Sequence, residues 1–161
     1  MADVPVELFR RFFAPSIRVR LNWDRLMKRP CRAQVTVIEK LAEITAWKMP
    51  WHFDRAGREI RYDSQGARPI SICEIGIHVK MNERRRSLID SLMEAYRLAQ
   101  NPVALVAPTY FIEPGVNLIL DANHRLAAAY LAGVQLRLMN FAIHGPLDSE
   151  IIPELKHWRT I

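Results

Sequence analysis

The segment from Asn117 to Gly133 constrains the fold of this chain more than any other. Residues 117–120 read as a short buried strand, and a turn of small residues separates them from an alanine- and leucine-rich run at 124–132. That run has the composition of a helix, and Gly133 suits the left-handed geometry found just past a helix end. A strand, a tight turn and a helix in succession place His124 and Arg125 at the carboxyl end of a strand, where open α/β sheets bind ligands.

Cationic side chains gather where two helices are expected to begin. The cations concerned are Arg84, Arg85 and Arg86 after the capping residue Asn82, and His124 and Arg125 after Asp121. A helix N-terminus carries roughly half a positive charge, so each cation there costs a few tenths of a kcal/mol. Glu83 is the one acidic residue in these first turns, where an acid normally stabilises the helix. A bound phosphate makes these cations favourable, because its oxygens accept hydrogen bonds from the free N–H groups and the guanidinium groups together.

On the first of these helices Arg84, Ser87 and Ser91 share one face at i, i+3 and i+7. Interpretations without a ligand stay open for these residues, namely a solvated arginine and surface serines. For the second helix the corresponding alternatives are a capping or partly buried imidazole at His124 and an ion pair between Arg125 and Asp121.

The remaining pattern predicts an α+β chain. Expected helices cover residues 7–13, 36–47 and 82–100, with a short one within 146–161; expected strands cover 17–21, 59–62, 70–79, 103–107, 110–112 and 136–143. In the helix over 82–100 the core stripe is expected at Leu88, Ile89, Leu92, Met93 and Tyr96.

The length, composition, net charge and cysteine count limit the classes of protein to which the chain can belong. With 161 residues, 50% of them hydrophobic, the chain is long enough for one compact domain. The net charge of +6 and the pI near 9.7 favour polyanionic partners such as DNA. Only Cys31 and Cys73 are present, so neither a disulfide framework nor a zinc site is indicated. With no signal peptide and no membrane-spanning run, a cytoplasmic protein is expected.

Residues 118–128, which read LILDANHRLAA, resemble the DGNHR-type signature of ParB-like domains, with Ala122 where glycine is common. The order of expected elements over 69–145 is similar to the ParB/sulfiredoxin core. The resemblance implies a mixed sheet with packed helices over 69–145, preceded by an N-terminal helical and hairpin extension over 1–68 and followed by a tail over 146–161.

A second resemblance concerns Arg84, Ser87 and Ser91, which match the Lys, Ser and Thr through which sulfiredoxins contact ATP. Asn123 stands where sulfiredoxins carry their catalytic cysteine, which excludes thiol chemistry at that position. The helix-turn-helix and dimerisation regions of chromosome-partitioning ParB proteins have little room in this length. The chain is therefore more similar to stand-alone members, including plasmid fertility-inhibition proteins of the Osa type, which implies ATP hydrolysis and DNA cleavage.

The resulting hypothesis is an ATPase, or another NTPase, that uses Mg²⁺ and also binds or cleaves DNA. Its expected catalytic residues are Asp121, Asn123, His124 and Arg125; its expected nucleotide-binding residues are Arg84, Ser87, Ser91, His124 and Arg125; its expected DNA-binding residues are Arg18, Arg20, Arg85 and Arg86. No set of protein metal ligands is predicted, although Asp121 or Glu83 is a candidate to hold Mg²⁺ or orient water. The alternative is a non-catalytic inhibitor or adaptor that binds nucleotide or DNA.

Overall fold

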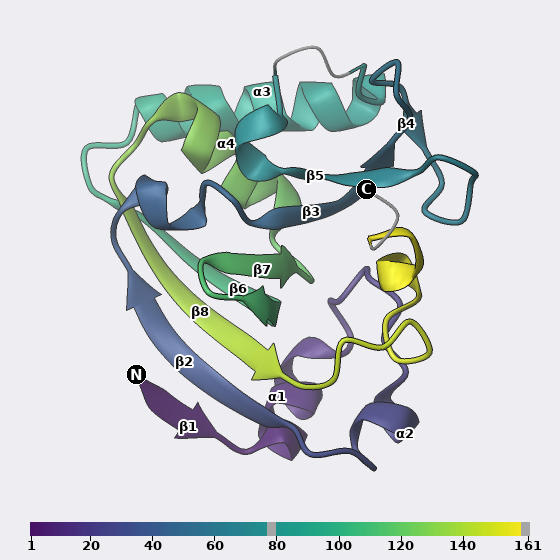
Figure 1. Ribbon diagram of the computed structural model, residues 1–161. Helices are drawn as coiled ribbons and strands as arrows, with labels where there is room; N and C mark the ends of the chain where they lie inside the picture. Colours follow the sequence, from purple (N-terminus) through teal and green to yellow (C-terminus); the bar gives the residue numbers. More distant parts are fainter. Residues whose placement is uncertain (77–79, 159–161) are drawn as a thin grey trace.

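The computed structural model describes residues 1–76 and 80–158, which form a mixed eight-stranded sheet with helices against both of its faces (Figure 1). This arrangement confirms the predicted α+β class. The strands are β1 (Ala2–Val4), β2 (Arg32–Ile38), β3 (Lys48–Phe53), β4 (Glu59–Ile60), β5 (Arg68–Ser71), β6 (Val103–Glu113), β7 (Val116–Ile119) and β8 (Leu136–His144). The helices are α1 (Val6–Phe13), α2 (Trp23–Leu26), α3 (Glu83–Arg97) and α4 (Asn123–Ala132), with 3-10 turns η1 (Leu41–Ile44), η2 (Ile72–Glu74) and η3 (Pro153–His157).

The strands lie in the order β1-β2-β8-β6-β7-β3-β4, and β5 pairs with β3 beside β4. The pairs β6–β8 and β3–β7 are parallel and the others are antiparallel. β6 joins the two strands that were predicted over 103–107 and 110–112, because Pro108 lies inside it and its carbonyl accepts from the Leu120 N–H at 3.0 Å. The long β6 and β8 form the centre of the sheet.

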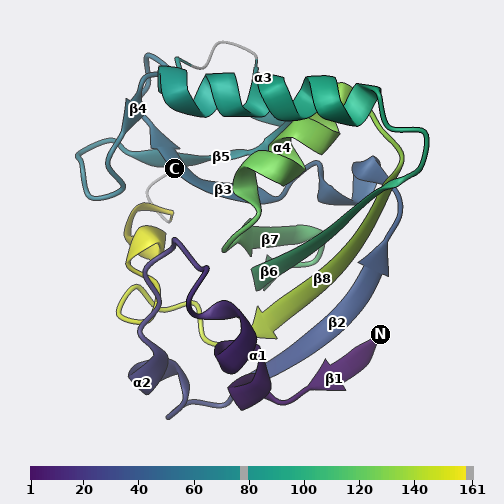
Figure 2. The same ribbon diagram turned by 180° about the vertical axis from the view of Figure 1, so that it is seen from behind.

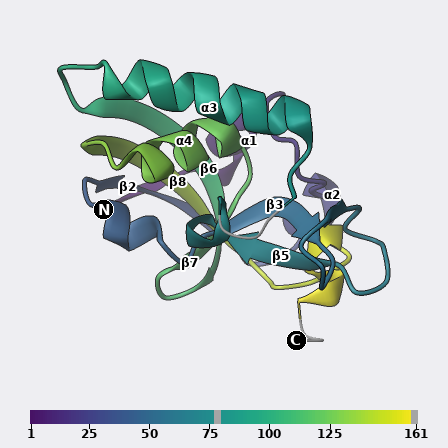
Figure 3. The same cartoon turned by 90° about the horizontal axis from the view of Figure 1, so that it is seen from above.

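Alternating side chains of the central strands belong to two different cores. Ile119 packs on the face covered by α3 and α4, whereas its neighbours Leu118 and Leu120 pack on the opposite face with α1 and α2. α3 and α4 lie side by side over their face (Figure 3), and α1 and α2 lie at the other end of the molecule (Figure 2). Buried side chains such as Leu126 and Phe9 are inaccessible to solvent, and each contributes roughly 1.5–3 kcal/mol.

Residues 1–68, which were predicted as an extension packed on the core, supply β1, β2, β3 and β4 to the same sheet. The helix predicted over 36–47 is wrong. β2 continues to Ile38 and pairs with β8 over seven residues, and only η1 is helical before β3 begins. The β-branched residues around Val37 favour a strand once β8 offers a partner, so tertiary pairing overrides the helical spacing.

The strand predicted over 17–21 is also wrong, because this segment is irregular and joins no ladder. Its alternating pattern arises from Val19, which is buried in the second core between two exposed arginines. The segment is tied by single bonds: the Arg18 N–H donates to the Leu120 carbonyl at 3.2 Å, and the Asn22 N–H donates to the Ile151 carbonyl at 2.8 Å. These bonds tie residues 18–22 to the residue after β7 and to the segment that contains Ile151.

Several local predictions are confirmed: the helices at α1, α3 and α4, the strand at β8, and Gly133 in left-handed geometry after α4. The strand predicted over 70–79 is shorter, because the Ser71 and Glu74 capping box starts η2 directly after β5. Residues 77–79 lie outside the described residues. The terminal helix expected within 146–161 is the 3-10 turn η3. Within the described ranges, no helix has the length and apolarity needed to cross a membrane.

Candidate functional site

A hollow of about 710 Å³ lies at the N-terminus of α4. We call it the α4 hollow. Residues 121–125 form its floor, and α3 contributes Arg85, Leu88 and Leu92. Its remaining walls come from distant parts of the chain, through Arg18, Pro50, Trp51 and Glu154. The expected catalytic residues therefore all border one hollow, at the position predicted from the strand, turn and helix.

The turn into α4 is strained. Ala122 has φ of 67°, and it is the one residue other than glycine with positive φ in the described part of the chain. A left-handed conformation costs a residue with a Cβ roughly 1–2 kcal/mol. A glycine at this position would adopt the same conformation without that cost. Strained residues of this kind cluster at functional sites.

The backbone amides that open α4 have no acceptor from a capping side chain. Ala122 occupies the N-cap position, where it offers no side-chain oxygen, and the first turn contains no acid. The first helical bond runs from the Leu126 N–H to the Ala122 carbonyl at 2.9 Å. The N–H groups of residues 123–125 precede that bond and belong to the unpaired donors of a helix start.

Asn123 adds an unsatisfied atom at the same place. Its side chain is only 6% exposed, and its Oδ1 has no hydrogen-bond partner. Leaving a buried polar group unpaired costs about 1–3 kcal/mol. Natural proteins pair most such groups, so this orphan atom beside an uncapped helix indicates a ligand site.

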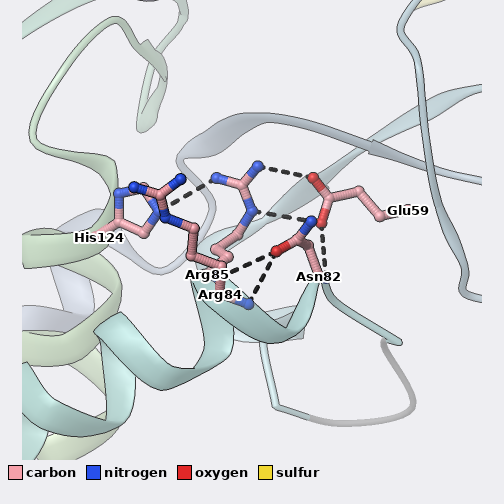
Figure 4. A network of polar contacts seen from close by, with 5 residues as sticks. All are labelled: Glu59, Asn82, Arg84, Arg85 and His124. Carbon is pink, nitrogen blue, oxygen red and sulfur yellow. Dashed lines mark hydrogen bonds and ion pairs between the residues drawn. The ribbon is translucent and has the colours of Figure 1, made fainter.

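His124 is held by a network centred on Arg85 (Figure 4). The Arg85 guanidinium donates to Glu59 through Nη2 at 2.7 Å and Nε at 3.3 Å, and its Nη1 lies 3.2 Å from Nε2 of His124. The same guanidinium lies 4.2 Å from the ring centre of Trp51, and the Trp51 and His124 rings are 5.1 Å apart. Arg85 is thus fixed by an acid, an imidazole and an indole.

This network keeps His124 neutral. A guanidinium can only donate, so Nε2 of His124 accepts and its proton resides on Nδ1. Burial lowers the pKa of His124 below its usual value, and the positive charge of Arg85 lowers it further. The prediction from charge counted His124 among the cations, but near neutral pH the positive charge comes from the arginines.

Arg18 and Arg125 are the exposed cations of the α4 hollow. An ion pair between Arg125 and Asp121 was the alternative considered from the sequence. Both of these residues lie in the described part of the chain, and no ion pair joins them. The Arg18 backbone is fixed at the end of β7 by its bond to the Leu120 carbonyl. The two guanidinium groups are therefore available to an anion in the hollow.

The face of α3 that borders the α4 hollow is one residue away from the predicted face. Arg84, Ser87 and Ser91 are exposed and do not line the α4 hollow. The residues that do so are each one position later, Arg85, Leu88 and Leu92, a rotation of roughly 100° about the helix axis. Leu88, predicted to be in the core stripe, is 47% exposed, whereas Ile89 is fully buried.

At the N-terminus of α3, a capping side chain accepts from the Arg84 and Arg85 amides. Oδ1 of Asn82 accepts from the Arg84 N–H at 2.9 Å and from the Arg85 N–H at 3.3 Å (Figure 4). Glu83 adds an acid to the first turn. The structure thus brings together Asp121, Asn123, His124, Arg125, Arg85 and Arg18, and leaves the sulfiredoxin-like set on the outer surface.

Two of the residues expected to contact DNA lie apart from the hollow. The Arg20 guanidinium lies over the Tyr62 ring at 5.5 Å, and its Nη1 donates to the Tyr62 hydroxyl at 3.1 Å. Arg86 is half-buried on α3 and does not line the hollow.

Sequence reasoning missed Glu154, which lines the α4 hollow from η3. Its side chain is 6% exposed, and Oε1 accepts from the Arg20 N–H at 3.1 Å, while Oε2 has no partner. Burial raises the pKa of Glu154. No local pattern signals this role, because a bond across 134 positions of sequence brings Glu154 to the site.

Comparison with protein-family models, with curated proteins and with solved structures finds no match to this chain. The resemblance to ParB/sulfiredoxin domains therefore remains a prediction from the signature and the order of elements.

Proposed function

We propose that the α4 hollow binds a nucleotide, with ATP as the first candidate, and that the protein hydrolyses it as a member of the ParB/sulfiredoxin fold. The observation that carries the proposal is the uncapped N-terminus of α4 next to the buried side-chain amide of Asn123, whose Oδ1 has no partner and whose NH₂ group can turn toward an anion. Helix amides and a converging set of arginines are the usual means of holding phosphate.

In this arrangement the phosphate oxygens accept from the N–H groups of residues 123–125, and Arg18 and Arg125 supply positive charge from two sides. Arg85 is already bonded to Glu59 and His124, so it forms a fixed wall that orients His124. The apolar side chains of Leu88 and Leu92 border the same hollow and suit the flat face of a base.

Hydrolysis of a phosphoanhydride depends mainly on positioning and charge neutralisation. In our proposal Asp121 orients the attacking water, Asn123 positions a phosphate, and Arg125 neutralises the developing charge. Mg²⁺, when bound to the nucleotide, would add charge neutralisation, and the oxygen atoms of Asp121 and Asn123 are of the type it prefers. No group of three His, Cys, Asp or Glu side chains that could hold a metal is found within residues 1–76 and 80–158, so phosphates would supply most of its ligands.

A DNA partner is the second part of the proposal. The net charge of +6 and the exposed Arg18 and Arg20 support contact with a phosphate backbone. Among the described residues no cluster of carboxylates could hold metal ions, which argues against two-metal cleavage, so DNA binding is favoured over DNA cleavage.

A non-catalytic nucleotide-binding module is the second candidate function. The observation that favours it is the Arg85 group 3.2 Å from Nε2 of His124, which leaves that nitrogen with no free lone pair to take a proton. In this function nucleotide binding would control a partner, and no phosphate would be released.

Phosphate release from ATP, measured with the full chain and with His124→Ala, separates the two functions. The enzyme is expected to release phosphate with Mg²⁺ present and to lose about 100-fold of the rate on His124→Ala, because the variant lacks the Nδ1–H that His124 can donate to the reacting phosphate. Thermal shift with ATP reports binding independently, since ligand at 100 times its Kd adds about 2.7 kcal/mol to folding. Binding without turnover would establish the module, and no binding of ATP, CTP or GTP would refute both.

A further inference from the structure

Two residues that line the α4 hollow carry buried acceptor atoms without a hydrogen-bond partner. Oδ1 of Asn123 and Oε2 of Glu154 both lack partners, and each side chain is 6% exposed. The two residues line the same hollow, although one comes from α4 and the other from η3. Phosphate oxygens only accept hydrogen bonds, so a phosphate can bond a side chain that turns a donor toward it but cannot bond an ionised carboxylate.

The two acceptors are not equivalent. The Asn123 side chain carries an oxygen and an NH₂ group, and rotation of its amide turns a donor toward an anion. The Glu154 carboxylate has no such option. Its Oε1 is already bonded to the Arg20 N–H at 3.1 Å, so Oε2 is the atom left over for a donor on the ligand.

A nucleotide offers such a donor next to its phosphates. The ribose lies between the phosphates and the base, and its hydroxyl groups are the donors common to all ribonucleotides. An acidic side chain that accepts from a ribose hydroxyl is a recurring solution in dinucleotide-binding folds. Glu154 also shares the hollow with the amides proposed for the phosphates and with the apolar Leu88 and Leu92 proposed for the base.

We propose, on the basis of the proposed function, that Glu154 accepts a hydrogen bond from a ribose hydroxyl, so that the hollow selects ribonucleotides over nucleotides without ribose hydroxyls. The bond satisfies an atom that is otherwise buried without a partner. A site that hydrogen-bonds a hydroxyl discriminates strongly against an analogue that lacks it, because its own polar group is then left unpaired.

The test compares the Kd of ATP, 2′-deoxy-ATP and 2′,3′-dideoxy-ATP for the full chain by calorimetry, once with EDTA and once with Mg²⁺. The wild type is expected to bind ATP at least about 10-fold more tightly than the dideoxy compound under both conditions, which corresponds to about 1.4 kcal/mol. Glu154→Met removes the acceptor and is expected to bring the two Kd values within about twofold.

Glu154→Gln is the second variant, for the case in which Glu154→Met does not fold. A neutral amide still bonds a hydroxyl, but without charge assistance, so the ratio should fall at least about threefold. Glu150→Gln is the matched control. Glu150 lies in the same tail, is exposed and pairs with Arg25, so its ratio should equal that of the wild type.

The outcomes separate this inference from the proposed function. If no nucleotide binds the wild type, the proposed function fails. If ATP and its dideoxy analogue bind the wild type equally, the inference fails and the function stands. An unchanged ratio in Glu154→Gln, together with a lower Tm, would show that Glu154 only stabilises the tail. A Glu154 variant that weakens both nucleotides equally, and only with Mg²⁺, would make Glu154 a metal ligand and also refute the inference.

Discussion

The N-termini of α3 and α4 both carry arginines, but a side chain caps the backbone amides of α3 and none caps those of α4. Both place arginine in the first turn of a helix, against the helix dipole. At α3 the side chain of Asn82 accepts from two amides, and Glu83 supplies an acid. At α4 the N-cap is Ala122, no side chain caps the amides and no acid follows. A cation at a helix start is therefore informative only when the cap is known as well.

The difference extends to the arginines themselves. Arg84 of α3 is exposed at a helix end whose amides are already paired, whereas Arg125 of α4 borders a hollow where the amides are free. An anion gains charge attraction at both ends, but it gains unpaired backbone donors only at α4. The comparison predicts that only α4 binds phosphate.

Charge reversal at equivalent positions should give the largest effect. Arg125→Glu is expected to weaken ATP binding about 100-fold, because it replaces a charge-assisted bond with repulsion. Arg84→Glu is expected to change the Kd less than about threefold, since an acid in the first turn of α3 is favourable to that helix. Calorimetry with both variants measures the difference. Equal losses in the two variants would mean that the helices contribute alike.

Removal of the α3 cap should affect stability and spare binding. Asn82→Ala leaves the Arg84 and Arg85 amides without their acceptor and is expected to lower the free energy of unfolding by about 1 kcal/mol. Denaturant titration measures this loss. The Kd of ATP for the folded variant should stay within about twofold of the wild type; a tighter Kd would show that Asn82 occupies a second phosphate site.

Relief of the strain in the α4 turn should have a smaller effect with the opposite sign. Ala122→Gly removes the Cβ from a residue with φ of 67° and is expected to raise the free energy of unfolding by about 0.5–1 kcal/mol. Gly133, which already has positive φ of 64°, gives the matched test, because Gly133→Ala should lower it by a similar amount. A destabilised Ala122→Gly would indicate that the buried Ala122 methyl matters more than its backbone.

The pH dependence of stability is the smallest expected difference. The pKa of His124 is lowered in the folded protein, so the unfolded chain binds more protons, and stability falls as the pH drops below about 6.5, the unfolded value. The pKa of His144 is lowered too, by burial and then by Arg32, and acts in the same direction. Thermal unfolding between pH 7.5 and 5.5 should therefore show a shallower decline for His124→Asn than for the wild type. An identical decline would show that His124 does not contribute to the pH dependence of stability.

The parts that the sequence predicted are those with local causes. α4 follows from its alanine-rich run with Gly133 at its end, and α3 follows from the Asn82 cap and the stripe through Ile89. The parts that failed depend on distant partners. β2 is a strand because β8 pairs with it about 100 positions later, and helical spacing around Val37 carries no information on that pairing.

The same division applies to the site. The turn at residues 121–125 was predicted because it is contiguous, and the Ala122 strain could be anticipated from the glycine that similar signatures carry. The wrong face of α3 was chosen because a rotation of one residue depends on how Ile89 packs. Glu154 could not be predicted, because long-range contacts of its segment, among them the Arg20 bond, place it beside α4.

The irregular segment around Arg18 connects the α4 hollow to the C-terminal part of the chain. It bonds to the end of β7 at Leu120, and to the tail at Ile151 and Glu154. A ligand bound in the hollow would therefore hold the segment around Arg18 and the tail at Glu154 together. Digestion of the tail by a protease should slow when the hollow is filled, so the resistance of the last dozen residues would report occupancy without any label on the guest.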